Sequence, residues 1–428
     1  MRILVISRSP WRNDNSFGNT YTNIFNGMQD VTIANIYLAD GFPDGQNQVV
    51  THYYQMSESK LLKSVRNFCK GKKVGNEVFI NSIDSNSKEE TSTKIAVVKK
   101  KRWSVFFIAR EFLWKIGNTN LSEMIEFVKE FNPDIVFLPF YYAKYVSNMA
   151  MYILDRICVP LVLEASIDIY SLKQLSFDPF FWINRFAIRS TIRKVVKRAQ
   201  KLYVISQKMK YDYEKMLKID CSILYKFPEM SRKFETYKRN SIEKGLVFLY
   251  TGNIGNGRWR SLALAGDAII SSGVGKLKIY TPTKLTCQMR ESLKNCEVYP
   301  PVVSDCVIKL QNEADVLIHA ESFKLKERLE VRYSISTKIM DYIGAGRCIL
   351  AIGSKDIASI EFLKKNKIAI ICDSKKAITQ KINFLKNNPN IVKMYADQTT
   401  EYINSLPTKA QQQENLRKEL LNIIEEYK

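Results

Sequence analysis

Residues 331–353 read VRYSISTKIMDYIGAGRCILAIG, and this stretch decides the fold of the second half of the chain. Ser336 is a good helix N-cap, and Gly346 is a stop signal before a short apolar run. Between them, apolar residues recur at the spacing of one helix face. The pattern therefore predicts a helix that leads into a buried strand, the repeating unit of an α/β sheet.

The start of this helix carries the groups of an anion site. A helix N-terminus offers unpaired backbone N–H groups and a positive dipole, and Ser336, Thr337 and Lys338 add hydroxyl donors and a full charge. Asp341 follows on the same face, where its carboxylate can accept hydrogen bonds from sugar hydroxyls. Phosphate and ribose together indicate a nucleotide. The alternative interpretation is an ordinary capped helix with a solvated Asp341.

Composition indicates a folded globular protein with more than one domain. The 428 residues suit two domains of about 200 residues each. No apolar run approaches the ~18 residues that span a bilayer, and charges interrupt the apolar start too soon for a signal peptide. We expect a cytoplasmic protein. The eight cysteines form no paired motif and only two histidines accompany them, so we expect reduced thiols and no metal site.

The formal net charge of +22 calls for an anionic partner. Residues 1–240 hold 37 Lys and Arg against 23 Asp and Glu, so +14 of the charge lies there. Nucleic acid, anionic lipid and phosphorylated substrates all fit such a balance, and a general bias towards lysine is the simpler alternative. We expect no nucleic-acid binding, because the basic residues interleave with helix cores and no binding module is present.

The first half alternates strands and helices, as a doubly wound parallel sheet does. Residues 2–7 predict a buried strand, and Gly18 in the loop that follows is a candidate substrate-binding residue. Polar residues 82–93 predict a loop. Further elements are expected as helices at 19–25, 121–131, 143–156 and 180–201 and as strands at 31–37, 134–139, 160–164, 202–206 and 223–225.

The second half repeats the alternation after a polar linker. Strands are expected at 246–251, 277–280, 297–299, 315–319 and 368–372, with helices between them. Two separate runs of strand and helix imply two doubly wound domains. We expect an N-terminal domain at 1–228, a linker at 229–244, a C-terminal domain at 245–395, and helices at 396–428 that pack back on the body.

Two segments of the first half carry the pattern of a membrane-surface helix. Four cations at residues 99–102 precede an aromatic-rich helix at 103–114, and the helix at 180–201 repeats Arg185, Arg189 and Arg193 at i, i+4 spacing. Aromatic rings at headgroup level and cations on anionic lipid are one interpretation. The alternative is a packed helix with a solvated basic face.

A second anion loop begins the second half. The sequence TGNIGNGRWR at 251–260 follows a strand and opens a helix. Gly252 and Gly255 allow the backbone to approach an anion closely, Asn253 lies between them, and Arg258 brings a guanidinium suited to phosphate. The spacing differs from the dinucleotide-binding fingerprint, and no acidic residue ends the next strand.

The chain resembles the GT-B glycosyltransferases of the retaining family 4 type over nearly its whole length. Four places carry the resemblance, and the most specific is the helix start around Lys338. They are the first strand with residues 16–20, the strand and acidic loop at 159–168, the glycine loop at 250–258, and residues 314–318 with 336–346.

The resemblance implies two Rossmann-like domains facing a cleft. It also implies that Arg258 and Lys338 hold the donor diphosphate and that Asp341 replaces the family's ribose-binding glutamate. Glu164 and Asp168 become the candidate catalytic acids of the first domain. Tyr333 stands where the family has a second glutamate, and the nearest acids are Glu321 and Glu330.

The implied reaction transfers a sugar from a UDP-, GDP- or dTDP-sugar to a saccharide or lipid-linked saccharide, with retention. We expect no permanently bound cofactor and no metal, since no Asp-x-Asp motif occurs in the chain. Peripheral contact with the inner membrane face is a further expectation. A sugar-nucleotide epimerase on the same fold and an inactive glycosyltransferase-like subunit are the alternatives.

Overall fold

The computed structural model describes the whole chain except residues 45–48, 69–77, 81–103, 117–120, 229–244 and 389. The predicted linker at 229–244, the predicted polar loop at 82–93 and the cationic run at 99–102 therefore lie outside the described residues. The chain divides into two compact units. Unit 1 comprises Met1–Lys226 with Ala410–Lys428, and unit 2 comprises Phe227–Lys409.

Unit 1 is built on one sheet, which has eight strands in the described part of the chain, in the order β4-β3-β2-β1-β5-β6-β7-β8. All neighbours are parallel except β3 and β4. The strands are β1 Arg2–Ser7, β2 Thr32–Tyr37, β3 Val50–Gln55, β4 Val78–Ile80, β5 Ile135–Pro139, β6 Leu161–Ala165, β7 Ala199–Val204 and β8 Cys221–Ile223. The helices are α1 Ser16–Phe25, α2 Glu58–Phe68, α4 Ser104–Ile116, α5 Leu121–Phe131, α6 Lys144–Leu154, α7 Pro179–Val196, α8 Gln207–Leu217 and α17 Lys409–Tyr427.

The central strands of unit 1 are continuous apolar runs because helices cover both faces of a parallel sheet. Every residue of β5 and β6 is buried, Glu164 included. Helices α4, α6 and α7 pack against one another. The C-terminal helix α17 belongs to this unit, where Gln413 donates to the carbonyls of Ile24 and Asn26 at the C-terminal end of α1, each at 2.9 Å.

Unit 2 is built on a parallel sheet with six strands among the described residues, in the order β11-β10-β9-β12-β13-β14. The strands are β9 Leu246–Thr251, β10 Gly275–Tyr280, β11 Glu297–Tyr299, β12 Val316–Ala320, β13 Cys348–Ile352 and β14 Ile370–Cys372. The helices are α9 Arg258–Ser272, α10 Cys287–Ser292, α11 Ser304–Glu313, α12 Leu325–Val331, α13 Thr337–Gly344, α14 Ala358–Lys365, α15 Lys375–Asn387 and α16 Asn390–Ser405.

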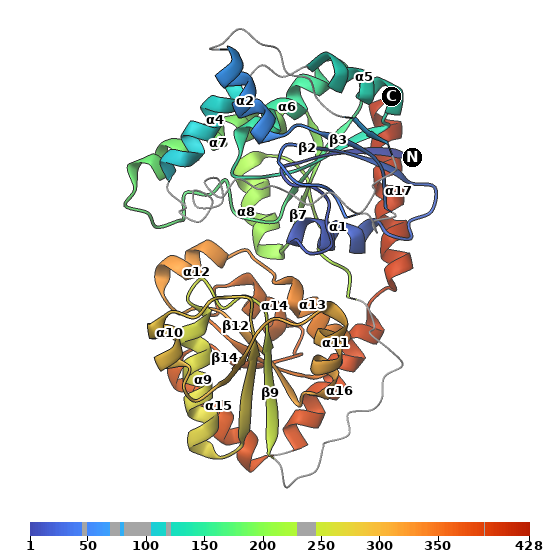
Figure 1. Cartoon of the computed structure of the whole chain (residues 1–428). Coiled ribbons are helices and arrows are strands. Elements are labelled where there is room, and N and C mark those ends of the chain that lie inside the picture. Colours follow the sequence, from blue (N-terminus) through green and yellow to red (C-terminus); the bar gives the residue numbers. More distant parts are fainter. Residues whose placement is uncertain (45–48, 69–77, 81–103, 117–120, 229–244, 389) are drawn as a thin grey trace. The chain divides into compact units, whose positions relative to one another are not determined.

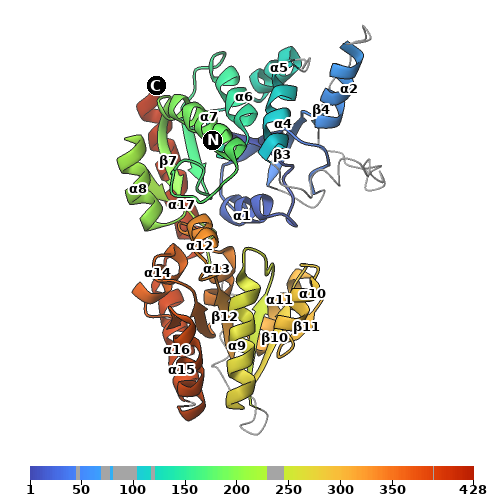
Figure 2. The same ribbon diagram turned by 90° about the vertical axis from the view of Figure 1, so that its left-hand side faces the viewer.

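Helices cover both faces of the second sheet. Figure 1 shows α9 and α15 on one face and α11, α13 and α16 on the other, and Figure 2 shows the same layers from the side. Apolar residues of α9 and α15 form one core with the strands. The predicted pair of parallel-sheet α/β units is therefore confirmed.

Several predicted elements differ from the observed ones in unit 1. Helix α1 begins at Ser16, three residues before the predicted start, because the Asn15 side chain caps it by accepting from Gly18 N at 2.7 Å. The helix predicted at 180–201 ends at Val196, and its last predicted residues belong to β7. Strands β3 and β4 were not predicted, since neither is a long apolar run.

Candidate functional site

Unit 2 contains a topological switch point between β9 and β12. The chain runs outward from β9 through β10 to β11 and then returns to form β12 on the other side of β9. In open α/β sheets, ligands bind beyond the carboxyl ends of the strands at such a point. The two loops predicted to bind an anion both reach this position, one after β9 and the other at the start of α13.

The glycine loop is shaped by close contacts that only glycine permits. Gly252 has a φ of +114°, and a Cβ there would lie 2.5 Å from Cε of Lys338. Gly257 has a φ of +73°, and its Cβ would lie 2.7 Å from the Ser322 hydroxyl in the loop after β12. The loop is therefore pressed against the start of α13 and the end of β12.

The Asn253 side chain accepts hydrogen bonds within and beside the glycine loop. Its Oδ1 accepts from the backbone N–H of Gly255 at 2.5 Å and from the Thr283 hydroxyl at 3.2 Å. The predicted binding residues Asn253 and Gly255 thus hold the shape of the loop, and the backbone N–H of Gly255 is used within it.

Tyr250 connects the two predicted loops, and sequence reasoning did not single it out. Its hydroxyl donates to the carbonyl of Asn253 at 2.7 Å and accepts from Nζ of Lys338 at 2.9 Å. The Lys338 ammonium also lies 4.6 Å from the centre of the tyrosine ring. One side chain therefore positions both the glycine loop and the lysine.

Lys338 is a half-buried cation held by a phenol. The pKa of Lys338 is lowered to about 8, chiefly by burial and also by the charge of Arg258, while the charges of Glu321 and Asp341 act in the opposite sense. An anionic ligand would restore the full charge. Asp341, the predicted ribose contact, lies three residues after Lys338 on α13.

Arg258 lies at the first position of α9 and pairs with Glu321. Its Nε and Nη2 donate to the two carboxylate oxygens of Glu321, each at 3.0 Å. Glu321 directly follows β12 and is buried, so the pair lies at the switch point itself. The position of this acid, one residue past a buried strand, is the signal that sequence reasoning had available and did not use.

The remaining predicted donors lie at the start of α13. Ser336 is the N-cap residue, but its hydroxyl makes no capping hydrogen bond, and Thr337 is exposed. Both hydroxyls lie beside Lys338 in sequence, at the end of the helix where backbone N–H groups are unpaired.

Tyr333 and His319 are core residues. Tyr333 is 2% exposed, and the Arg332 guanidinium lies 4.4 Å from its ring centre. His319 is buried on β12 with Nε2 at 2.9 Å from the Ser359 hydroxyl. Burial lowers the pKa of His319 to about 3, so it stays neutral.

In unit 1, Glu164 is a buried acid with hydroxyl partners. Its carboxylate accepts from Tyr21 Oη at 2.7 Å and from the Ser166 hydroxyl. Burial raises the pKa of Glu164 to about 7, although both hydrogen bonds lower it. The group is therefore poised to change protonation near neutral pH, as an acid or base requires.

Asp168, the other predicted catalytic acid, makes a buried ion pair and several hydrogen bonds within unit 1. Its carboxylate pairs with Arg185 at 3.2 Å, and both side chains are 1% exposed. It also accepts from the Ser171 hydroxyl and backbone N–H and from Tyr213 Oη. This network fastens the segment before α7 to the helix and uses the carboxylate internally.

In the structure, Gly18 and the arginines of α7 have contacts that differ from the predicted ones. Gly18 lies buried in the first turn of α1, where a Cβ would lie 2.1 Å from the carbonyl oxygen of Arg12, so backbone packing explains this glycine. The arginines predicted to form an exposed basic stripe contact the protein instead. Arg185 pairs with Asp168, and Arg189 donates to the Tyr170 carbonyl.

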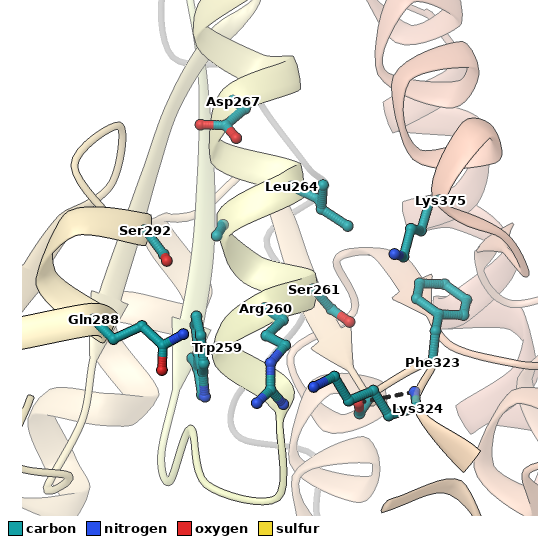
Figure 3. Close-up of a pocket in the computed structure, with 12 residues that line it drawn as sticks. Trp259, Arg260, Ser261, Leu264, Asp267, Gln288, Ser292, Phe323, Lys324 and Lys375 are labelled. Atoms are coloured by element: carbon teal, nitrogen blue, oxygen red, sulfur yellow. Dashed lines mark hydrogen bonds between the residues drawn. The ribbon is translucent and has the colours of Figure 1, made fainter. Parts of the chain in front are cut away.

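A cavity of about 490 Å³ lies on the outer side of α9 (Figure 3). Arg260, Lys324 and Lys375 bring three cations to its wall, and Asp267 lies further along the helix. Arg260 pairs with Glu327 at 3.3 Å. The cavity borders the loop after β12 and offers a second place in unit 2 where an anion can bind.

The described residues contain no group of three or more His, Cys, Asp or Glu residues arranged to hold a metal ion. None of their helices combines the length and apolarity needed to cross a membrane.

The structure is similar over its whole length to solved two-domain structures. The crystal structure of TarM has a TM-score of 0.61 at 10% identity and covers 99% of this chain and 98% of its own. Anabaena HepE in complex with UDP has a TM-score of 0.62 at 8% identity and covers 99% and 100%. The chain has the GT-B fold.

A third GT-B structure gives the same result. An alpha,alpha-trehalose-phosphate synthase (UDP-forming) from Burkholderia xenovorans has a TM-score of 0.59 at 8% identity and covers 98% of this chain and 100% of its own. Comparison with family models finds no match. Comparison with curated proteins also finds none. Identities this low establish the fold alone.

Proposed function

We propose that this chain is a glycosyltransferase that uses a nucleotide-sugar donor. The observation that carries the proposal is the convergence of Arg258, Lys338 and the glycine loop at the switch point of unit 2. Two cations beside a glycine loop at a helix N-terminus suit a diphosphate. Asp341, on the face of α13 that carries Lys338, is the proposed ribose contact.

These groups also supply the chemistry of transfer. As the bond from the sugar to the diphosphate breaks, negative charge grows on the leaving phosphate. Arg258 and Lys338 stabilise that charge, and both are held in place beforehand by Glu321 and Tyr250. Since two fixed cations already face the phosphate, we propose that the transfer needs no metal and, as the family 4 resemblance implies, proceeds with retention.

The proposed donor is a UDP-sugar. Anabaena HepE is described in complex with UDP, and the Burkholderia synthase is described as UDP-forming. The proposed acceptor is a saccharide or lipid-linked saccharide bound by unit 1. Glu164 is its proposed acid or base, because its pKa lies near neutrality. Asp168 is the positioning residue of the same region.

Binding of UDP-glucose, GDP-glucose and dTDP-glucose, measured by calorimetry on the full chain, tests the donor site. We expect UDP-glucose to bind and Lys338→Ala to weaken it by roughly 10- to 100-fold. Lys375→Ala is the matched control, because Lys375 is exposed and lines the cavity of Figure 3. If only Lys375→Ala lowers affinity, the donor site is misplaced.

Two outcomes would overturn the proposed activity. Failure of all three nucleotide sugars to bind would favour an inactive glycosyltransferase-like subunit. Epimerisation of UDP-glucose in the absence of any acceptor would favour the epimerase alternative. Release of UDP that depends on an added saccharide acceptor is the result expected of a transferase.

A further inference from the structure

The segment before α7 and the first turns of that helix expose large apolar side chains. Phe177 is 97% exposed, which leaves its ring almost wholly in solvent. We call this surface the apolar ridge. Its members are Leu172 45%, Leu175 41%, Phe177 97%, Phe180 46%, Ile183 57% and Phe186 55% exposed. Soluble monomers rarely leave so many large apolar side chains together in water, so the ridge indicates a binding surface.

Helix geometry explains why these residues share one side. Phe180, Ile183 and Phe186 are spaced by three along α7, so they lie on one face. The opposite face is buried and includes Ile188 and Ile192. The core therefore already has one apolar face of α7, and the ridge is a second apolar face that the described part of unit 1 leaves exposed.

The neighbouring helix adds to the exposed apolar surface. Helix α4 packs against α7, and the two lie side by side in Figure 1. On α4, Phe112 is 61% exposed and Ile116 is 49% exposed, one helical turn apart. Lys115 lies next to them and is exposed.

The charged residues around the apolar ridge indicate which kind of partner binds it. From Pro179 to Tyr211 the chain has nine Lys and Arg residues and no Asp or Glu. On α7 the outer face continues from Phe186 to Lys194, and Lys197 follows the helix, both exposed. Within the described residues, neither lysine has an ion-pair partner. An apolar surface bordered by unpaired cations fits an anionic partner.

We propose that the apolar ridge docks on an anionic phospholipid surface. The rings of Phe177 and Phe180 enter the headgroup region, and Lys194 and Lys197 meet lipid phosphates. A second copy of this chain is disfavoured because two such basic surfaces would repel each other. A lipid layer also accepts a protruding ring like Phe177 without a preformed pocket.

Co-sedimentation of the full chain with vesicles tests the proposal and needs no donor or acceptor. Vesicles of phosphatidylcholine with about a third phosphatidylglycerol are compared with pure phosphatidylcholine at low salt. We expect binding to the anionic vesicles and a more than roughly tenfold loss for the triple variant Phe177→Ser, Ile183→Ser, Phe186→Ser. Tyr211→Ser is the matched control, because Tyr211 is 66% exposed on α8 of the same unit.

A charge-reversal variant measures the contribution of the lysines to vesicle binding separately from that of the apolar side chains. Lys194→Glu with Lys197→Glu is expected to lower vesicle affinity by roughly tenfold or more, with the effect shrinking at high salt. Equal binding by wild type and the triple variant, or no binding to anionic vesicles, would overturn the proposal. So would a dimer that only the triple variant dissociates, since the ridge would then be a contact between copies.

Discussion

Two buried pairs of an arginine and a carboxylate occupy comparable places in the two units. In unit 1, Arg185 and Asp168 are each 1% exposed, whereas in unit 2 the Arg258 side chain is 18% exposed beside Glu321. Arg185 uses all three nitrogens on protein oxygens, including the carbonyls of Asp168 and Ser171. Arg258 uses only Nε and Nη2 in the hydrogen bonds of the described residues.

The difference distinguishes a structural pair in unit 1 from the pair in unit 2 that we propose binds the donor. Every donor of Arg185 is satisfied inside the protein, so a ligand could bind it only by breaking the network. Arg258 is oriented by the same kind of carboxylate and keeps Nη1 for a ligand. The number of satisfied donors, which residue type alone does not reveal, therefore supports opposite proposed roles for the two arginines.

Arg185→Leu should have the largest effect and should act on stability alone. Removing one partner leaves the Asp168 carboxylate buried without its cation, at a cost of about 3–5 kcal/mol in unfolding free energy. Urea unfolding measures the loss. Arg198→Leu is the control, because its pair with Asp155 is exposed and should contribute less than about 1 kcal/mol.

A double variant sharpens this prediction. Arg185→Leu with Asp168→Leu removes both charges and should recover part of the lost stability. Equal losses in the single and double variants would mean that packing of the long arginine side chain, rather than the charge pair, holds the segment.

Glu164 extends the comparison to a buried carboxylate that accepts hydrogen bonds from the hydroxyls of Tyr21 and Ser166. Because the pKa of Glu164 is raised to about 7, the folded protein binds more protons than the unfolded one between about pH 4.5 and 7. Unfolding free energy should therefore fall as pH rises from 5 to 8, by about 3 kcal/mol at most. In Glu164→Gln this fall should vanish. The exposed Glu130→Gln should keep it.

Arg258→Ala tests whether the Arg258–Glu321 pair of unit 2 contributes to donor binding. Loss of Nη1 should weaken UDP-glucose binding by roughly 10- to 100-fold, measured by calorimetry. Arg328→Ala is the control in the same unit, because Arg328 pairs with Asp356 at 2.8 Å in a more exposed place. If both variants bind the donor as wild type does, Arg258 is structural like Arg185 and the comparison fails.

The sequence predicted the features that depend on local order. Buried parallel strands are continuous apolar runs, so β9 was predicted to the residue. The glycine loop and Lys338 were found because both lie where a strand or loop meets a helix start. Strand β3 was missed because His52 and neighbouring polar residues interrupt its apolar pattern.

Features that join distant residues were not predictable in this way. Arg258 and Glu321 are 63 residues apart, and Tyr250 and Lys338 are 88 apart. No local pattern connects them. The i, i+4 spacing of Arg185 and Arg189 predicted an exposed stripe, because helix periodicity shows which residues share a face and cannot show what that face contacts.

The smallest expected effect, and the most specific one, is the pH dependence that Lys338 gives to donor affinity. The pKa of Lys338 is lowered to about 8, and a diphosphate binds the protonated form, so donor affinity should hold below about pH 7.5. Above about pH 8 it should fall by roughly tenfold per pH unit, until the pKa of the complex is reached. Lys338→Arg should remove the fall, because arginine stays charged throughout this range. Lys375→Arg should leave the wild-type profile unchanged. A flat profile in the wild type would mean that Lys338 does not contact the donor phosphates, and that Tyr250 holds it for packing alone.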